Sequence, residues 1–209
     1  MKLISLVSSG IDSPVATFLF SNKAEEIVLI HADNWPFTDN REIKNFIAIA
    51  KHLKKKMSAN IKAYILPHGD TLSSYKKNCT NRFTCIFCKR MLLRYAEKIA
   101  NKENADAIIM GDSLGQVASQ TLQNIRVIEQ AIDSPILRPI IGYDKEDIVQ
   151  IAKKIGTYDL SIAKSTGCSA VPNKPATMAQ LDAILTEEKK IDVDKLVKRA
   201  VNKAELISL

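Results

Sequence analysis

The first fourteen residues constrain the fold of this chain more than any other stretch. Residues 3–7 are an apolar run, and a turn of small residues follows directly and leads into Asp12, Ser13 and Pro14. This order is typical of a strand, an anion-binding loop and a helix, because small residues let backbone N–H groups approach a phosphate at the positive end of the next helix. We expect Pro14 to be the first helical residue, with Asp12 or Ser13 as N-cap. The residues expected at the bound phosphates are Ser8, Ser9, Gly10, Ile11, Asp12 and Ser13.

This loop lacks the lysine-containing G-x-x-x-x-G-K-[ST] sequence of P-loop proteins. A Ser/Gly loop with an acidic residue instead suits a nucleotide that is cut between its α- and β-phosphates. Mg²⁺ would bridge oxygens near Asp12, and pyrophosphate would leave. The alternative is an ordinary strand, turn and helix that bind nothing.

Strand-like and helix-like patterns alternate along the rest of the chain. Short apolar runs predict strands at 27–30, 63–66, 107–110 and 136–141, and helical spacing predicts helices at 41–57, 91–104, 116–131 and 144–155. Continuous apolar strands separated by helices indicate a parallel sheet covered on both faces. We therefore expect a doubly wound α/β domain with about five strands and a ligand at the carboxyl ends of the strands. We assign residues 1–176 to this domain and residues 177–209, with amphipathic segments at 177–189 and 193–206, to a helical extension packed on it.

Composition bounds the class of protein. The chain has 209 residues and a net charge of +7, which favours a polyanionic partner such as nucleic acid, although a lysine-rich solvated surface explains the same charge. The sequence shows no secretion signal and no apolar stretch that approaches a membrane span, so we expect a cytoplasmic protein with no membrane partner. In that compartment the four cysteines are expected to be ligands or reactive thiols rather than disulfides.

Cys85 and Cys88 form a C-x-x-C pair just before the helix expected at 91. The positive end of that helix, together with Lys89 and Arg90, would favour the thiolate forms. Cys168, in a loop expected at the carboxyl edge of the sheet, is the leading candidate for a further ligand. Spacing alone leaves three interpretations open, namely a metal or cluster site, a redox dithiol, and unliganded thiols. Zinc would need a fourth ligand, for which Cys79 and His68 are candidates.

Two further segments provide candidate binding residues. Residues 110–124 lead from a strand through two glycines into an expected helix. Small and amide-bearing residues such as Gly111, Gln116 and Gln120 suit the rim of a nucleotide or substrate site. His31 and Ala32 end the second expected strand, where a nucleotide site would place base or ribose contacts. Trp35 and Phe37, just after them, either cover the base or simply pack the loop.

The S-x-G-x-D-S pattern at 8–13 resembles the PP-loop ATPases, although Ser9 stands where these usually have glycine. More specifically, residues 111–124 resemble the G-[ED]-[SA]-L-G-Q-V-[AS]-S-Q-T-L-x-N sequence of the ThiI-type tRNA sulfurtransferases. Residues 88–91 match the C-K-R-M element of that family, and residues 137–146 resemble its L-R-P segment. The resemblance implies an enzyme that adenylates a uridine of tRNA with ATP and replaces O4 with sulfur, giving 4-thiouridine. It also implies catalytic roles for Asp12, Lys145 and Cys168.

The resemblance also indicates how sulfur is handled. One branch of the family appends a rhodanese domain, and the other holds an iron–sulfur cluster, 3Fe–4S or 4Fe–4S, on a C-x-x-C pair and a later cysteine. Cys85, Cys88 and Cys168 match the second branch. Because the usual THUMP domain is not found before residue 8, the expected partners are tRNA, a separate THUMP-like tRNA-binding protein, a sulfide or persulfide donor, and a second copy of the chain. Alternatives are a PP-loop enzyme that thiolates another substrate, such as a thiazole precursor, and a non-catalytic partner subunit that binds ATP and a cluster.

Overall fold

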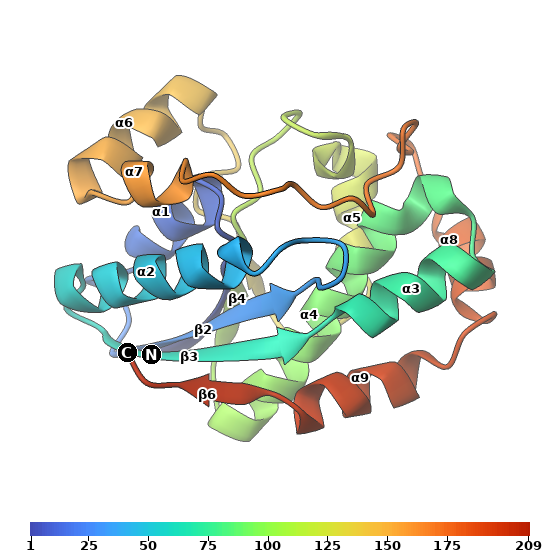
Figure 1. Ribbon diagram of the computed structural model, residues 1–209, viewed down its shortest axis with the longest axis horizontal. Helices are drawn as coiled ribbons and strands as arrows, with labels where there is room; N and C mark the ends of the chain where they lie inside the picture. Colours follow the sequence, from blue (N-terminus) through green and yellow to red (C-terminus); the bar gives the residue numbers. More distant parts are fainter.

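Six strands form one sheet in the order β5-β4-β1-β2-β3-β6, and a computed structural model describes all 209 residues (Figure 1). The five strands from β5 to β3 are parallel, and β6 pairs antiparallel with β3. The strands are β1 (Lys2–Leu6), β2 (Glu26–Asp33), β3 (Asn60–Pro67), β4 (Ala107–Ile109), β5 (Ile136–Leu137) and β6 (Glu205–Ile207). The expected doubly wound α/β class is confirmed, with six strands instead of about five.

Helices cover both faces of the sheet. They are α1 (Asp12–Phe18), α2 (Arg41–Lys56), α3 (Gly69–Asn78), α4 (Thr84–Glu103), α5 (Leu122–Glu129), α6 (Lys145–Ile155), α7 (Tyr158–Ser161), α8 (Leu181–Glu188) and α9 (Val193–Asn202), with short 3-10 turns η1 (Asn81–Phe83) and η2 (Ala118–Gln120). None of these helices has the length and apolar character needed to cross a membrane.

Successive residues of each central strand belong to two separate cores. Leu3 packs with α1, α2 and α6 on one face of the sheet, whereas Ile4 packs with α4 on the other face. The same alternation separates Leu29 from Ile30 in β2. Full burial of each such side chain contributes about 1.5–3 kcal/mol, so both faces must be covered. This explains why successive residues in the middle of a central strand, such as 27–30 of β2, are all apolar.

Several expected boundaries differ from the structure. The helix α1 begins at Asp12, with Ile11 at the N-cap and no side-chain cap, so the prediction that Pro14 starts the helix is wrong. The helix α4 begins at Thr84 instead of 91. The helix expected from 116 begins only at Leu122, where the Thr121 hydroxyl caps α5, and residues 116–121 form a loop and a 3-10 turn. The sequence reasoning missed α3. It also missed β6, which follows α9 and pairs with the backbone groups of β3 that would otherwise be unpaired at the edge of the sheet.

A buried ion cluster joins the C-terminal segment to α4. Arg90, which is 1% exposed, donates to both carboxylate oxygens of Glu188 at 3.0 and 2.9 Å, and Arg94 donates to the same oxygens at 2.8 and 2.9 Å. Burial raises the pKa of Glu188, but the hydrogen bonds from Arg94 and Arg90 outweigh it and lower that pKa to about 2. Arg90 therefore ties α8 to α4 and does not act on the neighbouring cysteines.

Replacing Glu188 with alanine would leave two arginines without their buried counter-charge. We expect a loss of about 3–5 kcal/mol in the free energy of unfolding, measured by urea titration. Asp70→Ala is the control, because Asp70 pairs with Arg199 on the surface, at 2.8 Å, and such pairs contribute about 0–1 kcal/mol. Equal losses in the two variants would contradict the role assigned to Glu188.

The lowered pKa of Glu188 also predicts how stability depends on pH. The contribution of this carboxylate is present above its ordinary pKa of 4.5 and is lost as the pH falls toward about 2. Glu188→Gln should therefore lose less stability than the wild type between pH 4.5 and 2. Parallel pH dependences of the two proteins in urea titrations would count against this assignment.

Candidate active site

A cavity of about 280 Å³ opens at the carboxyl ends of β1, β2 and β4. Of the residues expected to bind a nucleotide, its lining includes Ser8, Gly10, Asp12, Ser13, His31, Ala32, Gly111 and Gln120. Three further expected residues, Ser9, Ile11 and Gln116, are not among its lining. The lining residues come from four segments that are far apart in the sequence, namely the end of β1 with its loop and the start of α1, the end of β2 with its loop and the start of α2, the helix α4, and the stretch from the end of β4 to η2. The parallel sheet brings these segments to one edge.

The loop between β1 and α1 is held in shape by its own hydroxyl groups. The backbone N–H of Ser8 donates to the Ser13 hydroxyl at 2.9 Å, and the N–H of Gly10 donates to the Ser8 hydroxyl at 3.2 Å. The Ser9 hydroxyl turns away and donates to the carboxylate of Glu42 at the start of α2. The loop is therefore preformed as a small concave surface of backbone and hydroxyl groups, which suits a phosphate chain.

Gly111 lets two loops meet at the floor of the cavity. A Cβ atom at this position would lie 2.6 Å from the Cα and 2.8 Å from the N of Ser13. Both are backbone atoms of Ser13, in the first turn of α1. A side chain at 111 would therefore have to displace residues 8–13, which are called the phosphate loop below. The requirement for glycine here is steric, and it ties the end of β4 to the position of the loop.

His31 lies on the wall of the cavity with one free acceptor. Its Nδ1–H donates to the carbonyl of Val7 at 2.9 Å, and its ring stacks on Phe46 with centroids 4.4 Å apart. Burial lowers the pKa of His31, so the ring is neutral and Nε2 carries a lone pair. This buried Nε2 has no hydrogen-bond partner, and neither has Oε1 of Gln120, which also lines the cavity. Both atoms can accept a hydrogen bond from a ligand hydroxyl or amine.

The sequence reasoning missed a buried charge cluster centred on Asp112. This side chain lines the cavity and accepts from Lys89 at 2.6 Å and from Arg138 at 3.2 Å. Burial raises the pKa of Asp112, but the charges of Lys89 and Arg138 outweigh it and hold the pKa below its ordinary value. The only signal in the sequence was an acidic residue directly after Gly111, at the end of a buried strand.

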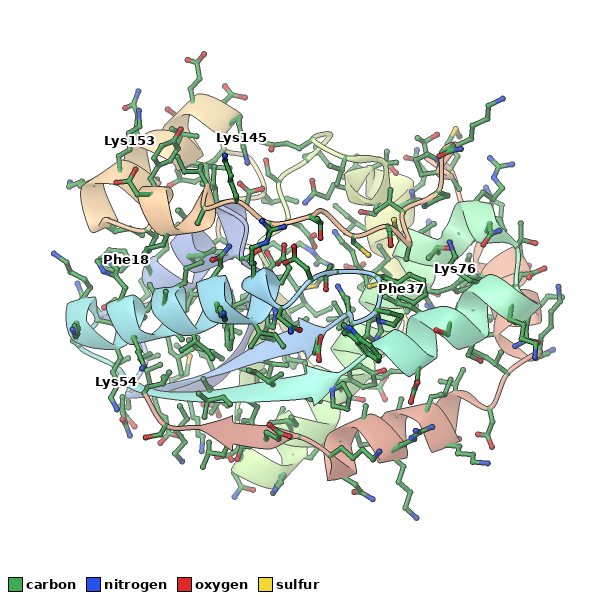
Figure 2. The ribbon with its side chains drawn as sticks, viewed as in Figure 1. Phe18, Phe37, Lys54, Lys76, Lys145 and Lys153 are labelled. Atoms are coloured by element: carbon green, nitrogen blue, oxygen red, sulfur yellow. The ribbon has the colours of Figure 1, made fainter.

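Asp12 and Lys145 meet at the rim of the cavity, although 133 residues separate them. Their side chains form an ion pair in which the lysine side chain is 48% exposed and the aspartate side chain 25% exposed. Lys145 is the first residue of α6, and Figure 2 shows it where that helix begins. A pair this exposed is weak and separates readily, so either group is free to turn to a bound ligand.

The segment between α7 and α8 crosses the open end of the sheet (Figure 1). Ser165 donates to Glu42 at 2.7 Å, Ser169 N–H donates to the carbonyl of Phe37 at 2.8 Å, and Ala176 N–H donates to the carbonyl of Arg82 at 2.9 Å. These bonds hold Cys168 close to the loops that follow β2 and precede α4. The hydrogen bonds of this segment therefore place Cys168 at the carboxyl edge of the sheet, where it was expected.

Cys85 and Cys88 lie in the first turns of α4, three residues apart, instead of in a preceding loop. Burial, and in second place the charge of Cys168, raise the pKa of the Cys85 thiol. Burial and the charges of Cys85 and Cys168 raise the pKa of Cys88 to about 12. Lys89 lowers both pKa values, as predicted, but burial outweighs it, and Arg90 is paired with Glu188 instead of acting on the thiols. Cys79 lies apart, where its thiol donates to the carbonyl of Glu187 at 3.3 Å.

Cys168 thus lies close enough to Cys85 and Cys88 to affect their pKa values, but the three side chains are not arranged as a metal site. No group of three or more His, Cys, Asp and Glu side chains is arranged to hold a metal ion. His68, the other candidate ligand, is fully buried and its Nδ1 is within 3.1 Å of the Tyr95 hydroxyl. Burial lowers the pKa of His68 to about 3. His68 is therefore a neutral core residue.

The sheet order, the Ser/Gly loop after β1 and the cavity at the carboxyl edge define a PP-loop nucleotide-binding domain. A family model described as "Thiamine biosynthesis protein (ThiI)" matches residues 1–193, and the chain belongs to this family. A relative from Methanosarcina mazei, named "Probable tRNA sulfurtransferase", is 38% identical over 209 residues, which are 100% of this chain and 52% of the relative. The chain thus spans about half the length of the curated relatives it matches.

Solved structures agree with this assignment. A crystal structure of a 4-thiouridine synthetase–RNA complex with bound ATP superposes with a TM-score of 0.93 at 32% identity, covering 99% of this chain and 55% of that one. The NMN synthetase from Francisella tularensis superposes with a TM-score of 0.61 at 12% identity over 96% of this chain and 84% of that one. The second likeness concerns the fold alone.

The contact between Gly111 and Ser13 predicts how the nucleotide site would respond to a small change. Gly111→Ala should displace the phosphate loop and reduce the rate of ATP turnover by on the order of 10²-fold, because misplacements of about 1 Å have such effects. Gly142→Ala is the matched control, since a Cβ there would meet nothing within 4 Å. Pyrophosphate release and calorimetric ATP binding would be measured for both variants. Unchanged turnover in Gly111→Ala would contradict the assignment.

Proposed function

We propose that this chain is the catalytic domain of an ATP-dependent tRNA sulfurtransferase that converts a uridine to 4-thiouridine. The observation that carries the proposal is one edge of the sheet where a preformed phosphate loop, a cavity and three free thiols lie close together. Membership of the ThiI family and the likeness to an ATP-bound 4-thiouridine synthetase–RNA complex support it. A cytoplasmic location is part of the proposal, because the substrate is tRNA.

In the proposed first step, ATP lies along the edge of the sheet with its phosphates on the loop of Ser8, Gly10 and Ser13. His31 and Gln120 accept hydrogen bonds from the nucleoside. The uracil O4 attacks the α-phosphorus, the bond to the β-phosphate oxygen breaks, and pyrophosphate leaves. Lys145 leaves Asp12 and stabilises the negative charge that develops on the phosphate oxygens.

Asp12 is the residue that would hold Mg²⁺. Its carboxylate lines the cavity beside the phosphate loop, and its present partner Lys145 is exposed and can withdraw. Carboxylate and phosphate oxygens are the ligands that Mg²⁺ prefers. Bound there, the ion would neutralise part of the charge of the polyphosphate.

In the proposed second step, a sulfur nucleophile attacks C4 of the adenylated uracil, and AMP leaves with the former O4. Cys85, Cys88 and Cys168 are the residues that would hold an iron–sulfur cluster, and such a cluster would supply a binding site for sulfide. Their chemistry fits this group, because all three are free thiols and thiolates are the usual ligands of such clusters. The alternative sulfur carrier is a persulfide on Cys168. Its outer sulfur would attack C4, and a second thiol would then attack the Cys168 sulfur, forming a disulfide with it and leaving the outer sulfur on C4.

The remaining partners stay predictions. They are a sulfide or persulfide donor, a separate THUMP-like protein that binds tRNA, and a second copy of this chain. A second candidate function is thiolation of a thiazole precursor, which the description of the matching family as a thiamine biosynthesis protein favours.

The proposal is tested by incubating the chain with ATP, sulfide and tRNA and measuring AMP, pyrophosphate and 4-thiouridine. Lys145→Ala should reduce AMP formation by about 10²–10³-fold, as the loss of one group that stabilises transition-state charge does. Lys153→Ala is the control, because Lys153 is exposed on the same helix, as Figure 2 shows. Asp12→Ala should likewise abolish turnover without unfolding the chain. Release of ADP and phosphate would exclude the adenylation step.

The cysteines are tested one at a time in protein prepared without oxygen. Changing Cys85, Cys88 or Cys168 to alanine should abolish sulfur transfer and the binding of iron and acid-labile sulfide, while calorimetric ATP binding is kept. Cys79→Ala should keep all three properties, because Cys79 packs against α8. Stoichiometric zinc, or a requirement for Cys79, would rule out the three-cysteine cluster.

A further inference from the structure

The loop after β2, the end of α3 and η1 carry five basic and aromatic side chains that the mechanism above leaves unused and that are together called the patch below. They are Trp35, Phe37, Lys76, Lys77 and Arg82. Trp35 and Phe37 belong to the loop after β2, the two lysines lie in the last turn of α3, and Arg82 lies in η1. Trp35 is 65% exposed, and both lysines and Arg82 are exposed as well.

The patch adjoins Cys168 and Cys85. Lys76 Nζ lies 5.8 Å from the centre of the Phe37 ring, and Figure 2 shows the two side chains together. The carbonyl of Phe37 accepts from both the N–H and the hydroxyl of Ser169, the residue after Cys168, at 2.8 and 3.1 Å. Arg82 lies three residues before Cys85. A ligand on this patch would thus lie directly beside the sulfur site.

The cations of the patch are free of acidic partners. Neither lysine forms an ion pair, and nor does Arg82, whereas nearby Arg199 and Lys190 are paired with Asp70 and Glu187 at 2.8 and 2.7 Å. Unpaired cations grouped at a site edge, in a chain with a net charge of +7, suit an anionic partner.

Trp35 is exposed although its backbone is firmly held. Its N–H donates to the Asp33 carboxylate at 2.9 Å, and its carbonyl packs so closely on Gly69 that a Cβ there would lie 1.7 Å from the carbonyl oxygen. The indole ring is thus carried by a fixed backbone and offers an open face. Aromatic side chains that combine with cations in this way bind unpaired bases by stacking while the cations contact phosphates.

We propose that this patch binds the single-stranded RNA that flanks the nucleotide to be modified. The proposal rests on the proposed function in taking the substrate to be RNA, and it adds where the RNA lies. Bases stack on Trp35 and Phe37, and Lys76, Lys77 and Arg82 contact the phosphates. The target uridine can then enter the cavity with Cys168 beside it.

The first test measures the binding of a fluorescently labelled single-stranded oligouridine to the full chain by anisotropy at several salt concentrations. Lys76→Ala/Lys77→Ala should weaken binding about tenfold at low salt and reduce the slope of log K against log salt by about 1.4, which is about 0.7 for each lost phosphate contact. Lys55→Ala/Lys56→Ala is the matched control, because these two exposed lysines end α2 at the opposite edge of the sheet. Equal losses in the two double variants would overturn the proposal.

The second test concerns stacking. Trp35→Ala should weaken oligouridine binding about tenfold, within the range found for loss of one stacked base, whereas Trp35→Phe should restore most of it. Thermal unfolding of each variant shows whether the fold is kept. If Trp35→Ala binds RNA as the wild type does, or if the patch variants lose only the binding of a protein sulfur donor, the patch is not an RNA site.

Failure of this proposal and failure of the proposed function are distinguishable. If the chain thiolates tRNA but the patch variants leave oligouridine binding and the KM for tRNA unchanged, the patch is wrong and the function stands. If the patch variants weaken RNA binding as expected but no tRNA is thiolated under any condition, the patch stands and the function is wrong. The KM for ATP should stay the same in every patch variant, because none of the five side chains lines the cavity.

Discussion

The parallel pairing of β1 between β2 and β4 is the constraint on which the rest of the structure depends. Leu3 is in register with Ile27 on one side and with Ala107 on the other, so the three strands end at the same edge. Segments that leave this edge therefore begin side by side. The phosphate loop, the end of β2 and the loop after β4 are thereby brought around one cavity, although they are distant in the sequence.

The site has one buried cluster of charged side chains inside the cavity and one exposed ion pair at its rim. At the floor, Asp112 is buried between Lys89 and Arg138, and these paired charges make the cluster a rigid part of the wall. At the rim, Asp12 and Lys145 are exposed and only weakly joined. A ligand that carries phosphates and a metal ion can separate the outer pair at low cost. The inner cluster would lose more, because the Asp112 side chain is only 5% exposed and a buried charge without its partner is costly.

The C-x-x-C element illustrates how one short sequence serves two purposes. Lys89, the residue after Cys88, lines the cavity, while Arg90 points away from it and binds Glu188 of α8. Lys89 and Arg90 point in different directions because α4 begins at Thr84, so both are helical residues, and successive side chains of a helix point to different sides. The same helix therefore carries the thiols and is anchored from behind by the C-terminal segment. The position of the thiols therefore depends on the ion pair between Arg90 and Glu188, which lies 98 positions later in the chain.

Local sequence determined the class of the fold and most of the expected residues that line the cavity. Apolar strands of the right length, small residues at 8–10 and glycine at 111 act within a few residues, so their patterns are readable without the structure. Only the tertiary structure decided which helix positions Cys85 and Cys88 occupy, that Asp112 and His31 become buried, and that β6 adds to the edge of β3. The raised pKa values of Cys85 and Cys88 were also decided there, because burial outweighs the nearby charge of Lys89. Burial and pairing are set by residues far apart in the chain, and no local pattern records them.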